Sequence, residues 1–154
     1  MISLNHLECN DMIDQLIPYR SRILAVSIGI IYLWFGVLKL FPGACPAEEL
    51  VKETMWMMTF GLIPPKISYF LLALWEVTIG IFLVLNLRKK VIIYLALVHI
   101  LFTFSPLFLF PSLSFNERIF TLTLVGQYII KNLIIFSSLL FILPEKQQSI
   151  AEGA

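Results

Sequence analysis

The chain has 154 residues, of which 59% are hydrophobic and 14% are charged, and its mean hydropathy is +0.90. A soluble domain carries roughly a quarter charged residues, so this composition argues against an ordinary soluble domain. The net charge of +1 gives no general attraction to nucleic acid. The two cysteines, Cys9 and Cys45, form neither a disulfide framework nor a metal-binding spacing.

Four apolar stretches are long enough to cross a bilayer as helices, which takes about 20 residues. They cover about 23–41, 67–87, 91–110 and 121–143. We therefore expect an all-α transmembrane four-helix bundle over 22–143, with a lead over 1–21 and a polar tail over 144–154. Because the loops are short, successive spans are predicted to run up and down.

A helix at the membrane surface is predicted between the first two spans, over 47–62. Charged residues alternate there with apolar ones, which is typical of an amphipathic interfacial helix, and Trp56 suits the level of the lipid headgroups. Pro42-Gly43 ends the span before it, and Pro64-Pro65 ends the surface helix itself.

Basic residues near the spans predict the orientation of the chain in the membrane. One side collects Arg20, Arg22, Arg88, Lys89, Lys90 and Lys146. The other side collects Lys52, Lys66 and Arg118. The first side is predicted to be cytoplasmic, so that both termini lie in the cytoplasm of a multi-pass protein of the cell membrane. Cys9 and Cys45 then lie on opposite sides and cannot pair.

One ionisable residue lies within each span, in order Lys39, Glu76, His99 and Lys131. Hydrocarbon cannot solvate a charge, so such residues face the protein interior or a wet cavity and seek partners. The helical rise places Glu76 and Lys131 about 14 and 15 Å from the outer surface, and His99 about 12 Å from the inner one. Since helical side chains lean toward the helix N-terminus, Lys39 and Glu76 should approach each other. We expect one carboxylate flanked by the ammonium groups of Lys39 and Lys131.

Further polar residues extend this predicted cluster on the fourth span. Gln127, Tyr128 and Lys131 share one face, and Asn132 adjoins them. The candidates for a ligand or proton site are therefore Lys39, Glu76, His99, Lys131, Gln127, Tyr128 and Asn132.

Small residues, and residues that share one helix face, indicate how the other spans pack. Tyr32, Gly36 and Lys39 share a stripe on the first span. Gly36 and Gly80 would let two helices approach closely.

A structural role for the buried charges is the alternative to a functional one. A buried lysine–glutamate pair can simply fix helix register. Lys39 by itself can be an end residue that snorkels to the surface. His99, on one stripe with Thr103, can be a hydrogen-bonded interior histidine.

Several kinds of redox and metal site are missing from the sequence. Only His99 lies in a span, whereas a haem held by two histidines needs a second, and His6 lies on the lead. There is no C-x-x-C, no H-E-x-x-H and no carboxylate cluster, so we expect no metal and no intrinsic cofactor. Electron transfer would have to use a diffusible quinone or a partner subunit.

The sequence resembles the DoxX-like family of four-span membrane proteins. The first span reads Tyr32-Leu-Trp-Phe-Gly-Val-Leu-Lys-Leu40, which is similar to the family's G-x-x-K. The second reads Trp75-Glu-Val-Thr-Ile-Gly80, similar to E-x-x-x-G, and a basic turn over 88–90 follows. The fourth carries Lys131-Asn132. The resemblance covers about 22–143 and implies a link to quinone oxidoreductases or redox-stress complexes, although the loop over 46–65 departs from the shortest members.

Three functions follow as expectations. The first is an accessory or assembly subunit of a membrane complex, which contacts the lipid bilayer and other membrane subunits or copies of itself. The second is a quinone-linked oxidoreductase subunit in which Lys39, Glu76 and Lys131 polarise or protonate the quinone oxygens. The third is a small proton-coupled carrier that uses Glu76 and His99.

Overall fold

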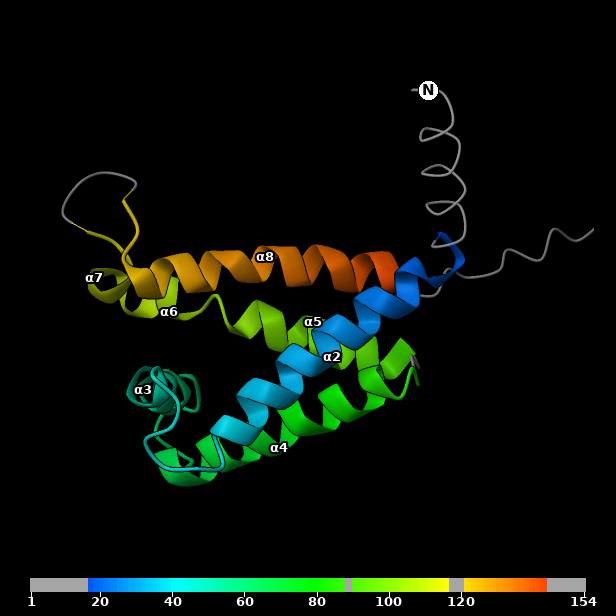
Figure 1. The fold of residues 1–154 in the computed structure, drawn as a ribbon. Coiled ribbons are helices and arrows are strands. Elements are labelled where there is room, and N and C mark those ends of the chain that lie inside the picture. Colours follow the sequence, from blue (N-terminus) through cyan, green and yellow to red (C-terminus); the bar gives the residue numbers. More distant parts are fainter. Residues whose placement is uncertain (1–16, 88–89, 117–120, 144–154) are drawn as a thin grey trace, which may run out of the picture.

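The structure, a computed structural model, describes residues 17–87, 90–116 and 121–143, and these are helical apart from turns and one isolated bridge (Figure 1). The elements are η1 Ile17–Tyr19, α2 Arg20–Leu38, α3 Glu48–Met58, α4 Pro65–Val84, α5 Lys90–Phe102, α6 Pro106–Leu109, α7 Pro111–Ser114 and α8 Leu124–Ile142. Four helical segments are long and apolar enough to cross a membrane, namely α2, α4, Lys90–Leu109 and α8. The all-helical class and the four candidate spans are therefore as predicted.

Capping residues explain why the helix ends differ by a few residues from the predicted ones. Pro65 occupies the first position of α4, where its missing N–H costs no helical hydrogen bond. Asn86, at φ 57°, follows the end of that helix in the left-handed region. Thr123 caps α8, and its Oγ1 accepts a hydrogen bond from the Gly126 N–H at 3.2 Å. The fourth span thus begins at Leu124 rather than at 121.

The third span is broken, whereas the sequence predicts one helix over 91–110. Proline has no N–H, and its ring clashes with the carbonyl four residues earlier. For Pro106 that carbonyl belongs to Phe102, where α5 ends. The Ser105 Oγ and the Ser105 N–H both donate to it, at 2.7 and 3.1 Å. A turn therefore separates α5 from α6, and the proline interrupts the helix instead of only bending it.

Close approach of α2 to α4 is the most extensive contact in the bundle, and three glycines make it possible. A Cβ on Gly29 would lie 2.9 Å from the Gly80 carbonyl oxygen, and one on Gly80 would lie 2.8 Å from the Leu33 nitrogen. A Cβ on Gly36 would lie 2.9 Å from the Val77 nitrogen. Side chains at these positions would push the two backbones apart.

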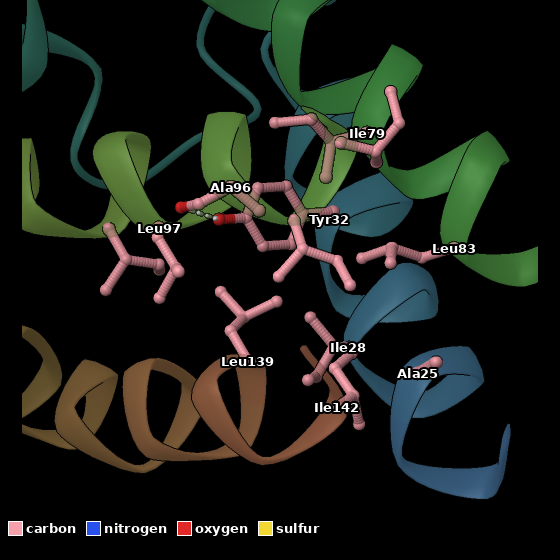
Figure 2. Packing of buried hydrophobic residues seen from close by; sticks show 12 residues of the cluster. Ala25, Ile28, Tyr32, Ile79, Leu83, Ala96, Leu97, Leu139 and Ile142 are labelled. Atoms are coloured by element: carbon pink, nitrogen blue, oxygen red, sulfur yellow. Dashed lines mark hydrogen bonds between the residues drawn. The ribbon is translucent and has the colours of Figure 1, made fainter. Parts of the chain in front are cut away.

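The hydrophobic core lies where α2, α4, α5 and α8 meet (Figure 2). Its buried members are Ala25, Ile28, Tyr32, Ile79, Leu83, Ile92, Ile93, Ala96, Leu97, Ile100, Leu139 and Ile142. α8 joins this core against α5 and α2 and leaves most of its surface uncovered. The outward-facing residues of all four spans are predominantly large and apolar, as lipid contact requires.

The helix predicted between the first two spans is present as α3, although it is shorter than 47–62. In Figure 1 it is seen nearly end-on while α8 runs across the picture, so its axis is steeply inclined to that span. It contacts α4 and α6, and the Ser105 Oγ donates to the Met58 Sδ at 3.3 Å. Trp56, Phe60 and Leu62 are exposed on this segment.

Charged residues of α3 pair with one another and also contact the preceding loop and α4. The Lys52 Nζ lies 2.6 Å from a Glu48 oxygen and 3.0 Å from Glu49, and it sits 5.6 Å from the centre of the Tyr69 ring on α4. The Gly43 N–H donates to the other Glu48 oxygen at 2.7 Å. The hydrogen bond from Lys52 holds the pKa of Glu48 below its ordinary value, and the Gly43 N–H acts in the same direction.

Some predictions concern residues outside the described part of the chain. These are the lead before residue 17, the tail from residue 144, Cys9, and four of the basic residues used for orientation, Arg88, Lys89, Arg118 and Lys146. Cys45 is described, and it is a buried free thiol. The orientation of the termini stays a prediction.

Candidate functional site

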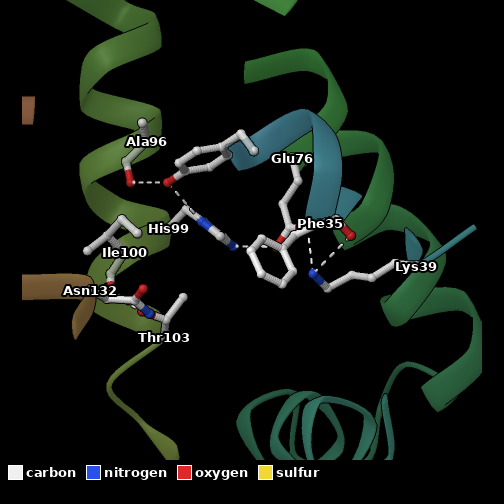
Figure 3. A network of polar contacts seen from close by, with 9 residues as sticks. Phe35, Lys39, Glu76, Ala96, His99, Ile100, Thr103 and Asn132 are labelled. Atoms are coloured by element: carbon white, nitrogen blue, oxygen red, sulfur yellow. Dashed lines mark hydrogen bonds and ion pairs between the residues drawn. The ribbon is translucent and has the colours of Figure 1, made fainter. Parts of the chain in front are cut away.

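Glu76 receives hydrogen bonds from two neighbouring helices at once. Its Oε2 lies 2.6 Å from the Lys39 Nζ at the end of α2, and its Oε1 lies 3.2 Å from the His99 Nε2 on α5 (Figure 3). The Lys39 and Glu76 side chains are each 7% exposed, and that of His99 is 10% exposed. A carboxylate removed from water is thus compensated on both oxygens, as a buried charge requires.

The second ring nitrogen of His99, Nδ1, extends the network to α2. The His99 Nδ1 lies 3.1 Å from the Tyr32 hydroxyl oxygen, and the Tyr32 O–H donates to the Ala96 carbonyl at 3.2 Å. The two rings are tilted by 60° with their centres 5.3 Å apart. Lys39, Glu76, His99 and Tyr32 therefore form one continuous chain of contacts, which we call the buried network.

Lys39 faces the interior, so the prediction that it snorkels to the surface is wrong. It is the residue directly after α2, and its Nζ also donates weakly to the Phe35 carbonyl at 3.5 Å. The expected lean of Lys39 and Glu76 toward each other describes their contact correctly. The attraction of the buried carboxylate exceeds the gain from reaching water, because Glu76 would otherwise be left without its cation.

Close helix packing is what brings these side chains into reach. Tyr32, Gly36 and Lys39 lie at i, i+4 and i+7 on α2, which places them on one face of that helix. A Cβ on Gly36 would lie 3.0 Å from the Glu76 Cβ, so a larger residue would displace the acid from α2. The glycine thus sets the distance across which Lys39 reaches Glu76.

Lys131 does not belong to the buried network, contrary to the prediction that it flanks Glu76. Among the described residues it makes no ion pair, its side chain is exposed, and its Nζ lies 5.1 Å from the centre of the Tyr128 ring. Ile129 and Leu139 are buried on α8, whereas Lys131 and Tyr128 lie on its exposed side. His99 occupies the place predicted for Lys131.

The remaining candidates on α8 divide between the inside and the outside of the bundle. Gln127 is exposed, and its Nε2 donates to the Leu122 carbonyl at 3.3 Å. Asn132 faces α5, where its Nδ2 donates to the Thr103 Oγ1 at 3.0 Å (Figure 3). Since the Thr103 hydroxyl in turn donates to the Ile100 carbonyl, Asn132 holds α8 against the end of α5, one turn beyond His99.

Two residues of this arrangement are absent from the candidates chosen on the sequence. Tyr32 closes the buried network, and its place on the stripe with Gly36 and Lys39 was the available signal. Gly29 pairs with Gly80 at the α2–α4 crossing. Gly29 could have been recognised from the sequence, because it lies seven residues, about two helical turns, before Gly36.

The buried network can hold and exchange protons, and it shows no features of a metal centre. In the part of the chain that the structure describes, no three histidine, cysteine or acidic residues come close enough to bind a metal ion. Imidazole and carboxylate groups in contact can share protons, and the tyrosine hydroxyl can both donate and accept.

The chain matches no family model, no curated protein and no solved structure. The resemblance to the DoxX-like family therefore stays a prediction that rests on the residues around Gly36, Glu76 and Lys131.

Proposed function

We propose that the chain is a DoxX-like multi-pass protein of the cell membrane and acts as an accessory or assembly subunit of a membrane complex, without a redox centre of its own. Its spans run up and down with both termini in the cytoplasm, which the short connections and the basic residues Arg20, Arg22 and Lys90 favour. The observation that carries the proposal is a contrast between the intramembrane ionisable residues. Lys39, Glu76 and His99 contact one another, whereas Lys131 on α8 makes no ion pair among the described residues.

Lys131 is the uncompensated charge. It lies seven residues after the start of α8, hence about 10 Å along the helix axis. It is exposed on a face that it shares with Tyr128, whose side chain is 66% exposed. An ionised lysine that faces lipid at this depth is costly, so intramembrane lysines pair with other groups. A partner that covers this face of α8 would remove the cost.

The chemistry of Lys131 selects a carboxylate on a transmembrane helix of another protein. Glu76 is the only acidic residue in the four spans of this sequence, and it already pairs with Lys39 and His99. A second copy of the chain therefore has no free intramembrane acid to offer. α8 also has the smallest buried share of the four spans, so it has the most surface left for a partner helix.

The proposal is tested by the size of the complex in mild-detergent extracts of the native membrane. We expect wild type to migrate as a complex larger than the chain, and Lys131→Leu to migrate as the free chain. Ser137→Ala is the matched control, because Ser137 is also exposed on α8 and donates only to its own helix at Leu133. A Lys131→Leu variant that stays in the complex would show that the lysine reaches lipid headgroups instead, and would contradict the proposal.

The two alternative functions rest on the buried network. A quinone carbonyl would need a donor from Lys39 or His99. The Lys39 ammonium donates to Glu76 and weakly to the Phe35 carbonyl, so one N–H remains, but this side chain is only 7% exposed and that of His99 only 10%. A proton-coupled carrier would use Glu76 and His99. The closed network favours the accessory subunit over the quinone-linked enzyme.

A further inference from the structure

The hydrogen-bond directions in the buried network determine how many protons His99 holds. The Tyr32 hydroxyl has one hydrogen, and two acceptors lie within its reach, the Ala96 carbonyl at 3.2 Å and the His99 Nδ1 at 3.1 Å. When the hydroxyl donates to Ala96, the 3.1 Å contact with the His99 Nδ1 is made by an N–H on the ring. Glu76, as a carboxylate, only accepts, so the Nε2 at 3.2 Å must also carry a hydrogen. In that arrangement of hydrogens, His99 is an imidazolium.

Loss of one proton requires only the rotation of a hydroxyl group. When Nδ1 is bare, it becomes an acceptor, and the Tyr32 O–H can turn from the Ala96 carbonyl to this nitrogen, since both lie within 3.2 Å of its oxygen. The Nε2–H stays on Glu76. Ala96 lies inside α5, where its carbonyl can accept the helical hydrogen bond from the residue four positions on. Neither state leaves a buried polar group of the network without a partner.

The surroundings of His99 act on its two protonation states in opposite directions. Lys39 and Glu76 cancel each other, so the network carries a charge of +1 with the imidazolium and none without it. Burial disfavours the charged state, and the adjacent carboxylate favours it. Imidazole is the side chain that changes charge between about pH 5 and 8, so these opposing effects act on a group suited to exchange.

We propose that His99 is a proton-binding site inside the membrane bundle, with Glu76 as the positioning residue and the Tyr32 hydroxyl as a switch between two acceptors. On release, the N–H bond at Nδ1 breaks, the electron pair stays on nitrogen, and the proton passes to water. The charged and titratable groups that face the site are Lys39 and Tyr32 from α2 and Glu76 from α4. α8 contributes the uncharged Asn132, and the site does not depend on a partner at Lys131.

The test is nitrogen NMR of the full chain in lipid bilayers, with ¹⁵N-labelled histidine and the background change His6→Gln, which leaves His99 as the only histidine. We expect two protonated ring nitrogens at low pH, and a protonated Nε2 with a bare Nδ1 at high pH. A ring that keeps one form from pH 5 to 9 would overturn the proposal and leave the network with a purely structural role.

Tyr32→Phe tests the switch while keeping the ring that packs in the core. It removes the acceptor of the Nδ1–H, so we expect the imidazolium to appear only about one pH unit lower, the equivalent of one hydrogen bond to a charged group. Thr103→Val is the matched control, because Thr103 lies one turn from His99 and contacts Asn132 instead. A Tyr32→Phe titration that coincides with wild type and the control would overturn the switch.

Discussion

Glu76 is the residue on which three helices converge, because its two oxygens accept from Lys39 on the α2 side and from His99 on α5. Desolvation of such a group is expensive, and the ion pair recovers this cost only while both partners are present. Removing one partner therefore destabilises the fold more than the intact pair stabilises it. The contacts also fix the relative positions of α2, α4 and α5.

A mutant cycle on Lys39 and Glu76 measures this coupling. We expect Glu76→Leu alone to lower the free energy of unfolding by on the order of 3 kcal/mol, because it strands a buried ammonium group. Adding Lys39→Met should cost less than the sum of the two single changes. Unfolding of the four variants in detergent micelles gives the numbers.

The control cycle combines Glu76→Leu with Lys131→Leu. These residues do not contact each other, so their effects should add to within about 0.5 kcal/mol. Coupling between Glu76 and Lys131, or strict additivity between Glu76 and Lys39, would contradict the structure.

At the scale of elements, the pair α2–α4 depends on Gly29, Gly36 and Gly80. Gly80→Leu would bring a Cβ to within 2.8 Å of the Leu33 backbone nitrogen, so the helices must separate. We expect a loss of about 1–3 kcal/mol, the usual cost of overpacking. Thr78→Ala on the exposed face of α4 is the control and should have almost no effect. An unchanged melting temperature for Gly80→Leu would show that the two helices are further apart.

The attachment of α3 should depend on pH through Glu48. Its pKa is lowered in the folded chain, so the contribution of its contacts with Lys52 and Gly43 is present above the ordinary carboxyl value and is lost as the pH falls below about 4. Hydrogen exchange of the α3 amides should therefore speed up in this range. Glu48→Gln removes the effect, and equal protection at pH 3 and pH 7 in wild type would contradict it.

Sequence reasoning located the spans because lipid demands apolar length, a property that any window of the sequence displays. It placed the helix ends less well, because these depend on caps such as Thr123 and on the local chemistry around Pro106. Apolar length alone predicts one helix over 91–110, whereas a single proline, Pro106, removes a donor, blocks the Phe102 carbonyl and divides this span into α5 and α6.

For the molecule as a whole, side-chain lean predicted the contact of Lys39 with Glu76, and depth identified His99 as a buried group. The place of Lys131 could not be predicted, because every face of a membrane helix is apolar and the sequence does not show which face of α8 turns toward α5. The contact of Asn132 with Thr103 depends on this same rotation, and the contact of Tyr32 with His99 depends on how α5 is turned toward α2.

The closed network also predicts how the purified chain responds to quinones. Because the Lys39 and His99 side chains contact Glu76 and are only 7% and 10% exposed, we expect no saturable binding of a ubiquinone or menaquinone analogue in a detergent titration. Saturable binding that disappears in Glu76→Gln, and persists in Ser137→Ala, would instead support the quinone-linked oxidoreductase.

The central claim is that Glu76 joins Lys39 and His99 inside the bilayer and leaves Lys131 free. The most direct test is carbon–nitrogen dipolar recoupling NMR of the full chain in lipid vesicles, measured from the carboxyl carbon of Glu76. The structure predicts couplings to the Lys39 Nζ and the His99 Nε2 and none to Lys131. A coupling to the Lys131 Nζ, or none to either predicted nitrogen, would contradict it.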